Sequence, residues 1–313
     1  MMQEIPKQHI LVSPPLFGFV APQKRSEYVH AQFERALAQG GFLIIRGKGG
    51  ALIELAPFES ECFGQTMGKI TWMWGPLSCS THLIDAILSE IRQYDLAHLA
   101  ICIEANQVRL IQAFERSGFY LVDNRVMLVH PLPKEKENPC LKNEKVDISP
   151  FRIQDLDAIQ CISSNAFTLS RFYADPNLPT QYVDELHRRW ILNDCNGRAD
   201  LVLVARDGER VLGYIACIYQ APQADFELPA HSEIDLIAVA PDARGLGIGT
   251  KLIDKVLHYY SGRATRVIVE TQGSNYPALN LYLKCGFQLV SLAVTLHWFR
   301  EAPYEGVGDC CSS

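Results

Sequence analysis

The stretch PDARGLGIGT, residues 241–250, places glycines at positions 245, 247 and 249. It follows the apolar run EIDLIAVA (233–240), which predicts a strand, and it precedes a pattern typical of an amphipathic helix. Glycine lets the backbone approach a ligand closely and turn its N–H groups toward one point. The N-terminus of a helix adds partial positive charge, and Arg244 adds a full one. Strand, loop and helix together therefore predict a cradle for a pyrophosphate.

Two other kinds of phosphate loop do not fit this stretch. A dinucleotide loop, spaced G-x-G-x-x-G, is the first turn of a βαβ unit and is followed by an acidic residue about 20 positions on. A nucleoside triphosphate loop ends in Gly-Lys-Ser/Thr, whereas Thr250 and Lys251 stand in the reverse order. The helix after the loop has one apolar stripe, made of Leu252, Ile253, Val256, Leu257 and Tyr260.

A second informative stretch is NYPALNLYLKCGF (275–287), which predicts a helix stopped by Gly286 before a new strand. The stretch AFERSGF (113–119) has the same punctuation 168 residues earlier, with Phe114 in the place of Tyr282. The flanking predicted strands also correspond, LAICIEA with RVIVETQ before each helix and LVDNRVMLVH with QLVSLAVTLHW after it. These matches favour an internal duplication, although strand–helix–strand units can also agree by chance.

The chain of 313 residues is long enough for two domains. The region 132–145 is rich in Pro, Lys, Glu and Asn and predicts a linker between a first domain (40–131) and a second (146–301). Residues 1–39 form an N-terminal extension, and 302–313 a flexible tail. The turn Asp207-Gly208 between two apolar runs predicts a hairpin. Mixed strands and helices predict an α+β fold, with helices on both faces of a mixed sheet.

Composition and charge narrow the function. The sequence is 48% hydrophobic and 20% charged, and its net charge of −6 disfavours nucleic-acid and membrane partners. Its ten cysteines include no CxxC pair, which indicates reduced thiols in a cytoplasmic protein. No His/Cys/Asp cluster has metal-ligand spacing, so we expect no metal. A homodimer is compatible with the sequence and is not indicated by it.

At this point the sequence resembles a known family. Residues 239–252 look like the acetyl-CoA motif of the GNAT superfamily of N-acetyltransferases, and 275–287 look like its second motif, N-x-x-A-x-x-L-Y-x-x-x-G-F. The segment SRFYADPNLP (170–179) and the helix around Trp190 are similar to sugar N-acetyltransferases of that superfamily. In the first half, FESECFG (58–64) resembles a W-D-S-x-x-F-G opening of that group, with Phe-Glu where Trp-Asp is usual. This departure and the missing glycine cradle imply a degenerate GNAT-like N-terminal domain.

The resemblance implies acetyl-CoA as the acyl donor and a role for each matching residue. The main chain of three residues would pair with the pantetheine arm: Ile237, Ala238 and Val239. Five residues would hold the pyrophosphate: Arg244, Gly245, Gly247, Gly249 and Thr250. Asn275 would contact the cofactor arm near the thioester, and Tyr282 would stand beside the sulfur.

Chemistry supports a catalytic Tyr282. Acetyl transfer to an amine needs removal of the amine proton and protonation of the departing thiolate. A phenol has a pKa of about 10 and a thiol about 8.5, so a tyrosine hydroxyl can donate to the sulfur if it reaches it. Without the surrounding motif, a core aromatic residue would be the better interpretation.

For the general base, strand alternation places Glu233, Asp235, Ile237 and Val239 on one face of a strand. If that face borders the cleft, Glu233 could take the amine proton directly or through water, with Asp235 as the reserve candidate. A solvated carboxylate at the start of the strand is an equally good interpretation of Glu233.

The acceptor is predicted to contact Ser170, Arg171, Phe172 and Asp175 in one loop. Arg171 could grip the diphosphate of a nucleotide sugar, and Phe172 or Tyr173 could stack on its base. A structural turn, helped by Asp175-Pro176, explains this loop equally well. His297, near the last predicted strand, is expected to be a core or edge histidine rather than a catalyst.

These expectations combine into an acetyl-CoA-dependent N-acetyltransferase with direct transfer to a small-molecule amine, in which a nucleotide-linked amino sugar is the leading acceptor through the resemblance. Acetylation of a protein N-terminus, a lysine or a small amine is the alternative within enzymes. A non-catalytic acyl-CoA-binding sensor or scaffold is the alternative of a different class. The first domain would be a degenerate copy that shapes one wall of the acceptor site.

Overall fold

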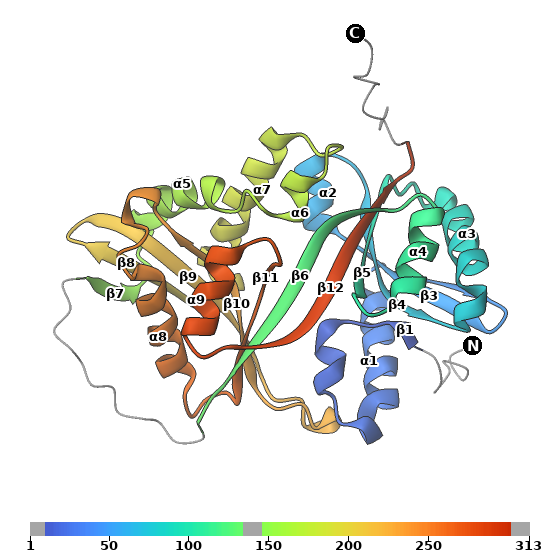
Figure 1. The fold of residues 1–313 in the computed structure, drawn as a ribbon, viewed down its shortest axis with the longest axis horizontal. Coiled ribbons are helices and arrows are strands. Elements are labelled where there is room, and N and C mark those ends of the chain that lie inside the picture. The colour runs from blue at the N-terminus through green and yellow to red at the C-terminus, as the bar shows by residue number, and fades with distance from the viewer. Residues whose placement is uncertain (1–9, 134–145, 302–313) are drawn as a thin grey trace, which may run out of the picture.

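A computed structural model describes residues 10–133 and 146–301, so most of the predicted linker and tail lie outside the described residues. The fold is one twelve-stranded mixed sheet with helices on both faces, as predicted (Figure 1). Along the sheet the strands follow the order β2-β3-β4-β5-β12-β6-β11-β10-β9-β8-β7, and β1 pairs with β4 beside this path. The strands are β1 (Ile10–Val12), β2 (Phe42–Arg46), β3 (Gly49–Leu55), β4 (Met67–Trp74), β5 (His98–Glu104), β6 (Tyr120–Pro131), β7 (Asp147–Pro150), β8 (Leu201–Asp207), β9 (Arg210–Gln220), β10 (His231–Val239), β11 (Arg266–Gln272) and β12 (Gln288–Phe299).

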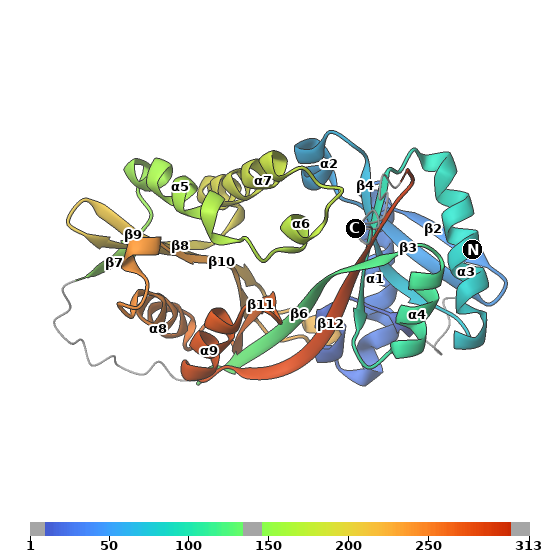
Figure 2. The same cartoon turned by 45° about the horizontal axis from the view of Figure 1, so that its top comes forward.

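The helices cover the sheet from both sides. They are α1 (Arg25–Ala38), α2 (Pro57–Phe63), α3 (Ser80–Ile91), α4 (Val108–Arg116), α5 (Leu156–Ala166), α6 (Arg171–Ala174), α7 (Thr180–Asn193), α8 (Ile248–Tyr260) and α9 (Tyr276–Lys284). Among the described residues, none of these helices combines the length and apolar character that crossing a bilayer requires. Figure 2 shows α5, α6 and α7 together on one side of the second half, with α8 and α9 on the other.

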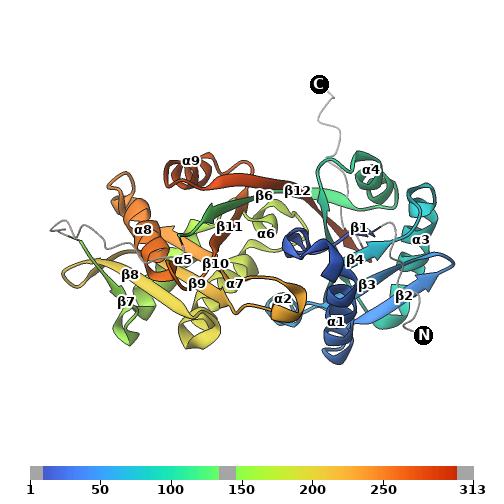
Figure 3. The same ribbon diagram turned by 90° about the horizontal axis from the view of Figure 1, so that it is seen from below.

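Two long strands, β6 and β12, lie antiparallel at the centre of the sheet and join its halves (Figures 1 and 3). Each pairs on its outer edge with the other half: β6 with β11 and β12 with β5. The hydrogen-bonded sheet therefore crosses the boundary that the sequence places between 131 and 146. The division into domains 40–131 and 146–301 stays a prediction, but each half gives its last strand to the sheet of the other.

The two halves repeat one unit at a constant spacing. Strand β11, helix α9 and strand β12 begin at 266, 276 and 288, each 168 residues after β5, α4 and β6 at 98, 108 and 120. The predicted duplication therefore has a structural counterpart, with α4 and α9 at opposite ends of the central strand pair (Figures 1 and 3).

The apolar residues of the predicted helix stripe form part of the core of the second half. Leu252, Ile253 and Val256 on α8 are fully buried against the sheet, and Tyr260 is buried at the end of the same stripe. The opposite face packs against α5 and α7. The predicted hairpin joins β8 to β9, with Gly208 at a φ of 58°. Both faces of the sheet are thus covered by helices, which fixes β10 in the middle of the half.

Strands β10 and β11 run side by side only at their beginnings. They pair in parallel from Ser232 to Ile234, while β10 continues to pair with β9 as far as Val239. A register shift beside Asp235 bends β10 at this point. The edge of β10 that faces β11 is therefore unpaired over Ile237–Val239, and the two strands leave a gap between them.

A buried ion pair fixes the start of the second half. Arg206 and Asp155 are each 3% exposed. The Arg206 Nε donates to Asp155 Oδ1 at 2.9 Å, a second guanidinium nitrogen contacts Oδ2, and the Arg152 N–H donates to Oδ2 at 2.7 Å. Burial acts to raise the pKa of Asp155, but these donors hold the pKa below its usual value. The carboxylate is therefore charged and fully partnered.

Replacing Asp155 with alanine should lower the free energy of unfolding by about 3–5 kcal/mol, because it leaves the buried Arg206 charge with only the exposed carboxylate of Asp147, 3.9 Å away. Urea unfolding followed by circular dichroism measures the change. Asp242→Ala is the control: Asp242 pairs with Arg210 on the surface, so its loss should cost no more than about 1 kcal/mol. Equal effects of the two substitutions would contradict the role given to the buried pair.

Candidate functional site

The predicted cradle, residues 244–250, borders a cavity of about 640 Å³ that we call the donor cavity. Gly245 and Gly247 have φ values of 77° and 76°, a backbone region that residues with a Cβ adopt with strain. A Cβ built on either glycine would meet no atom within 4 Å, so the space above both is open to a ligand. Gly247 is also the N-cap of α8, whose first N–H groups therefore border the cavity.

Gly249 has a different surrounding from the other two glycines. A Cβ at this position would lie 2.9 Å from Leu281 Cδ2 on α9. Its hydrogen atom thus lets α8 and α9 pack closely, in addition to its place in the lining of the donor cavity. Arg244 is exposed at the rim, where its Nε donates weakly to the Val239 carbonyl at 3.4 Å. Thr250 lines the same cavity from the first turn of α8.

The unpaired edge of β10 forms the opposite wall of the donor cavity. Ile237, Ala238 and Val239 all line it, and on this edge their main-chain groups have no strand partner among the described residues. A free strand edge offers alternating N–H and C=O groups to an extended amide-containing ligand. The gap, the open glycines and the helix N-terminus therefore fit the arm and the pyrophosphate of coenzyme A.

Tyr282 stands where the donor cavity meets a second cavity. It lines both, although its side chain is buried with only 3% exposure. Its ring packs against Phe287 at 5.6 Å, and its hydroxyl makes no hydrogen bond within the described residues. Burial raises the pKa of Tyr282, so the phenol keeps its proton at neutral pH. A protonated donor without a protein acceptor is therefore present at the junction.

Asn275 lines both cavities beside Tyr282. Its side chain caps α9: Oδ1 accepts from the Ala278 N–H at 3.3 Å, and Nδ2 donates to Thr271 Oγ1 at 3.3 Å. The N-cap hydrogen bond to α9 therefore fixes the position of the Asn275 side-chain amide.

The second cavity, of about 450 Å³, is called the acceptor cavity here. Its walls come from both halves of the chain. The second half supplies α6, α7, β10 and β11, while the first half supplies Asp123, Arg125 and Met127 from β6 and the segment Pro14–Leu16. The first half therefore supplies one wall of this cavity through the exchanged strand β6, and the contact of this wall with an acceptor stays a prediction.

Charged groups of both signs line the acceptor cavity. Arg125 pairs with Glu270 at 3.3 Å, and Arg171 pairs with Glu59 at 3.5 Å. Burial raises the pKa of Asp123 and also that of Glu270. Four carboxyl groups line the cavity (Asp123, Glu233, Asp235 and Glu270), against two guanidinium groups. The cavity is therefore more acidic than basic.

The two candidate bases differ in how many hydrogen bonds and ion pairs already engage their carboxylates. Glu233 lines the acceptor cavity with a partly exposed side chain, and its nearest ionisable partner is His231 Nε2 at 3.4 Å. Asp235 accepts from Trp190 Nε1 at 2.7 Å and from Arg198 at 2.6 Å, so both its oxygens are engaged. Of the two, Glu233 has the freer carboxylate for taking a proton.

The predicted acceptor loop divides into two parts. Ser170, Arg171 and Phe172 line the acceptor cavity; the Ser170 hydroxyl is buried without a hydrogen bond, and the Arg171 guanidinium lies 4.1 Å from the Phe172 ring centroid. Tyr173 instead bonds to Asp184 and lies outside the cavity lining. The loop thus presents one free hydroxyl and one cation to the cavity.

Asp175 does not line the cavity and is 1% exposed. Its Oδ1 accepts from Tyr120 at 2.9 Å and from the Asn177 N–H at 2.9 Å, and its Oδ2 contacts His297 Nδ1 at 2.7 Å. These contacts tie the loop to β6 and β12, so we assign Asp175 a structural role and do not carry it into the acceptor site. His297 is fully buried beside it, as expected for a core histidine.

The fold also assembles a cluster that sequence spacing does not indicate. His98, Asp175 and His297 each place one ligand-type atom within 4.8 Å of the others. They come from β5, from the loop after α6 and from β12, separated by up to 199 positions. Asp175 is held by Tyr120, by the Asn177 N–H and by His297, whereas His98 contacts His297 only through its ring, at 4.5 Å between centroids, and neither of its nitrogens has a hydrogen-bond partner among the described residues.

Sequence reasoning missed the lining residues that come from the first half. Asp123 and Arg125 alternate on one strand, a pattern that marks a polar face but not the half it serves. Pro14–Leu16 carry no chemical motif. Glu270 lies on β11. A charged residue within an apolar strand is a signal of a functional or ion-paired group, so its sequence position alone could have indicated it.

The chain is similar to a family model and to several curated proteins, three of which follow. Residues 165–287 match the model of the Acetyltransferase (GNAT) family. Spore coat polysaccharide biosynthesis protein SpsD of Bacillus subtilis is 30% identical over 142 residues, 45% of this chain and 46% of that protein. The dTDP-fucosamine acetyltransferase of Escherichia coli is 27% identical over 199 residues, 62% of this chain and 79% of that protein. A mycothiol acetyltransferase of Acidothermus cellulolyticus is 30% identical over 202 residues, 60% of this chain and 54% of that protein. The chain thus spans about half the length of two of these relatives.

Among solved structures, a tandem GNAT protein from the clavulanic acid biosynthesis pathway is similar with a TM-score of 0.50. The two chains share 10% identity, and the likeness covers 83% of this chain and 82% of that one. At this identity the likeness shows the fold alone. It extends over both halves, in agreement with the repeated unit. The matched residues 165–287 include the cradle, the edge of β10 and Tyr282, and the chain therefore contains an acetyltransferase domain of the GNAT family.

Proposed function

We propose that the protein is an N-acetyltransferase that passes the acetyl group of acetyl-CoA directly to an amine, with an amino sugar as the acceptor class. The observation that carries the proposal is the meeting of the donor and acceptor cavities at Tyr282. A site for direct transfer needs two ligand spaces that share one wall, and a group able to move a proton at that wall.

The residues of the donor cavity suit the cofactor that GNAT acetyltransferases use as acyl donor. The backbone of 237–239 would hold its amide-containing arm, and the cradle with Arg244 would hold its phosphates. When bound, acetyl-CoA supplies an acetyl thioester whose carbonyl is open to attack by an amine. Everything else that the reaction needs has to come from the side chains of this chain.

Tyr282 and Glu233 each carry out one of the two proton transfers: Tyr282 protonates the leaving thiolate, and Glu233 accepts the proton of the amine. Tyr282 is protonated and has no protein acceptor, so it can donate to a leaving thiolate at the junction of the cavities. Glu233 lies on the acceptor side and can accept the amine proton, directly or through water. Asn275, fixed as the cap of α9, would contact the cofactor arm near the thioester. The amine thus loses its proton on one side while the sulfur gains one on the other.

A nucleotide-linked amino sugar is the leading acceptor, with Arg171 on its diphosphate and Phe172 near its base. The names of two relatives support sugar chemistry, a spore coat polysaccharide protein and a dTDP-fucosamine acetyltransferase. The partners we propose are therefore small molecules in the cytoplasm, where nucleotide sugars are made. A screen of nucleotide amino sugars, followed by the release of CoA thiol, tests the assignment directly.

One observation favours a second candidate, an amine without a diphosphate. Both guanidinium groups of the acceptor cavity already pair with carboxylates, and carboxyl groups outnumber them. An acidic cavity attracts a cationic amine and opposes a diphosphate. A free amino sugar or another small amine would therefore enter without competition for Arg171.

Arg171→Gln separates these two acceptors. It should raise the KM for a dTDP-linked amino sugar by about tenfold or more, because a charge-assisted contact to phosphate is lost. The KM for free glucosamine should stay within about twofold. Arg189→Gln is the matched control, since Arg189 also pairs with a glutamate and lies over a phenylalanine ring, outside the cavity. An unchanged KM for the nucleotide sugar would exclude the grip on its diphosphate.

Tyr282→Phe should lower kcat by about 10²–10⁴-fold while the affinity for acetyl-CoA changes little, as expected for loss of a general acid. Initial rates and calorimetric titration with CoA measure the two quantities. Tyr276→Phe, six positions earlier on the same helix and 69% exposed, should leave both unchanged. A Tyr282→Phe enzyme with wild-type turnover would remove this residue from the mechanism.

Gly247→Glu should abolish CoA binding in a calorimetric titration, because it places bulk and negative charge in the open space of the cradle. Gly208→Glu controls for backbone strain. Gly208 also has positive φ (58°) and open space around it, but it lies in the β8–β9 hairpin. Binding that survives in the Gly247 variant would place the phosphates elsewhere.

A further inference from the structure

In the first half, strand β1 fills the gap between β4 and β5. These two strands pair in parallel only from Met67 to Ile70. Beyond that point β4 pairs with β3 on one edge, and on its other edge Met73 and Trp74 pair with β1. The edge of β4 is thus occupied by a strand that arrives from the N-terminal side of the chain.

This position corresponds to the cofactor gap of the second half. Parallel pairing ends at Ile234 in β10 and at Ile70 in β4. Three and four residues beyond lie Ile237 and Ala238 in β10, which border the donor cavity, and Met73 and Trp74 in β4, which pair with β1. The same backbone edge is therefore open in one half and filled in the other.

A side-chain contact at the N-cap of α4 supports the same correspondence between the two halves. Gln107 is the N-cap of α4, and Asn275, 168 residues later, is the N-cap of α9. The Gln107 Nε2 donates to the main-chain carbonyl of Leu11 in β1 at 2.8 Å. Asn275 lines the donor cavity at the matching place. Gln107 therefore holds β1 at the place in the first half that corresponds to the one where Asn275 would contact a cofactor arm in the second.

The chain after β1 leads directly to the acceptor cavity. Pro14, Pro15 and Leu16 line that cavity, and the segment is held further along by Phe17, whose ring packs on Trp72 at 5.0 Å. Two prolines restrict the backbone between these anchors. The 13–16 segment is therefore fixed at both ends, by β1 on one side and by the Phe17 contact on the other.

The 13–16 segment gives the acceptor cavity an apolar side. Asp123, Arg125 and Glu270 line the same cavity with charged groups. A sugar ring has a C–H face that packs on apolar side chains and hydroxyl groups that bond to charged ones. A wall of two prolines and a leucine, together with a charged wall, suits such a ring better than an extended aliphatic amine.

We propose that β1 permanently occupies the first half's counterpart of the cofactor gap and thereby holds the 13–16 segment as a specificity-determining wall for the sugar ring of the acceptor. The assignment of the wall rests on the proposed function. Leu16 contacts the acceptor, and Gln107 is a positioning residue that acts through β1. The degenerate half thus uses its former ligand gap to build part of the active site of the other.

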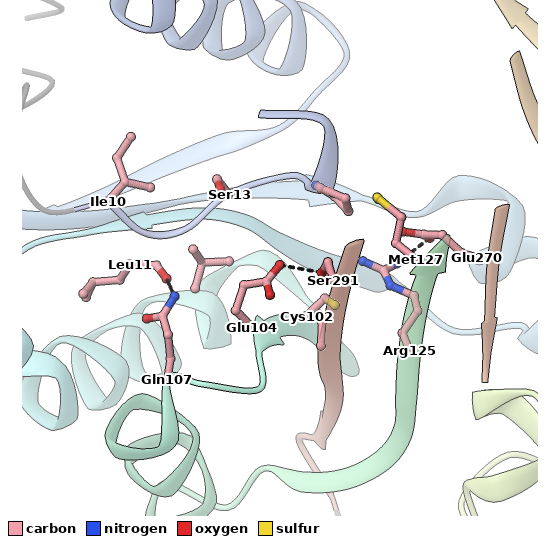
Figure 4. Close-up of a pocket in the computed structure, with 13 residues that line it drawn as sticks. Ile10, Leu11, Ser13, Cys102, Glu104, Gln107, Arg125, Met127, Glu270 and Ser291 are labelled. Carbon is pink, nitrogen blue, oxygen red and sulfur yellow. Dashed lines mark hydrogen bonds and ion pairs between the residues drawn. The ribbon is translucent and has the colours of Figure 1, made fainter. Parts of the chain in front are cut away.

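Cys102 reports the position of β1 without any need for activity. It lines a small cavity of about 70 Å³ that also includes Ile10–Ser13 of β1 and its continuation (Figure 4). Figure 4 shows the Gln107 side chain bonded to Leu11 beside this cavity. Loss of that bond should let β1 open more often. In the full chain, Gln107→Ala should raise the rate at which iodoacetamide modifies Cys102 by about fivefold.

Peptide mass spectrometry follows the modification, with the exposed Cys79 as an internal reference that should not change. Gln93→Ala, an exposed glutamine of the same half, is the matched control and should leave Cys102 at its wild-type rate. An unchanged Cys102 rate in Gln107→Ala would overturn the anchoring of β1.

Kinetics test the wall itself, with free glucosamine and a dTDP-linked amino sugar as acceptors. Leu16→Ala should raise the KM for the better acceptor by about tenfold and leave the KM for acetyl-CoA within about twofold. Gln107→Ala should also raise the KM for the acceptor, by a smaller factor, and leave the KM for acetyl-CoA unchanged. A general structural defect would instead affect the KM values of both substrates. Leu77→Ala, 41% exposed and outside both cavities, should change neither.

The failures of the two proposals are distinguishable. An acceptor KM that is unchanged in Leu16→Ala, in an enzyme that acetylates glucosamine, refutes the wall and leaves the acetyltransferase. Absence of acetylation by the wild-type protein with both acceptors refutes the acceptor class and the wall together. In that case a Cys102 response to Gln107→Ala still shows that β1 fills the gap.

Discussion

The hydrogen bonds between β6 and β12 are the constraint on which the rest of the structure depends. Each of these strands is the last of its own half and pairs with an inner strand of the other, β11 or β5. Neither half can complete its sheet alone, because removal of one exchanged strand would leave the N–H and C=O groups of a buried strand without partners. The two halves therefore form one sheet, and the acceptor cavity lies where the exchanged strand β6 meets the second half.

This exchange gives the first half a place in the acceptor cavity. Its β6 brings Asp123 and Arg125 into the acceptor cavity, where Arg125 pairs with Glu270 of β11. Phe114 stands in the place of Tyr282, fully buried against Phe119 in an apolar core. A hydroxyl there would need a hydrogen-bond partner that this core does not offer. Within the described residues the first half thus contributes an apolar core and one wall of the acceptor cavity.

Local sequence patterns predicted helices and strands, the glycine loop before α8 and the place of Tyr282 on a helix, because glycine spacing, helix stripes and strand runs act over a few neighbouring positions. The stripe from Leu252 to Tyr260 and the turn at Asp207-Gly208 are examples. Pairing between distant strands is not written in such patterns: nothing local in LVDNRVMLVH shows that it lies beside β11 rather than within its own half. For the same reason the sequence does not decide between a contact to the acceptor and a structural turn at Asp175, whose buried contacts come from Tyr120 and His297.

The main-chain N–H and C=O groups of an unpaired strand edge inside a sheet need hydrogen-bond partners, because they lose water as the surrounding helices pack. The two halves meet this requirement differently. In the first, β1 covers the edge at Met73 and Trp74 with a segment of the same chain. In the second, the edge at Ile237–Val239 borders a cavity and stays accessible to water or ligand. An edge that another strand covers adds stability, and an accessible edge adds a surface for binding. A single duplicated unit therefore supplies both when only one copy keeps its gap open.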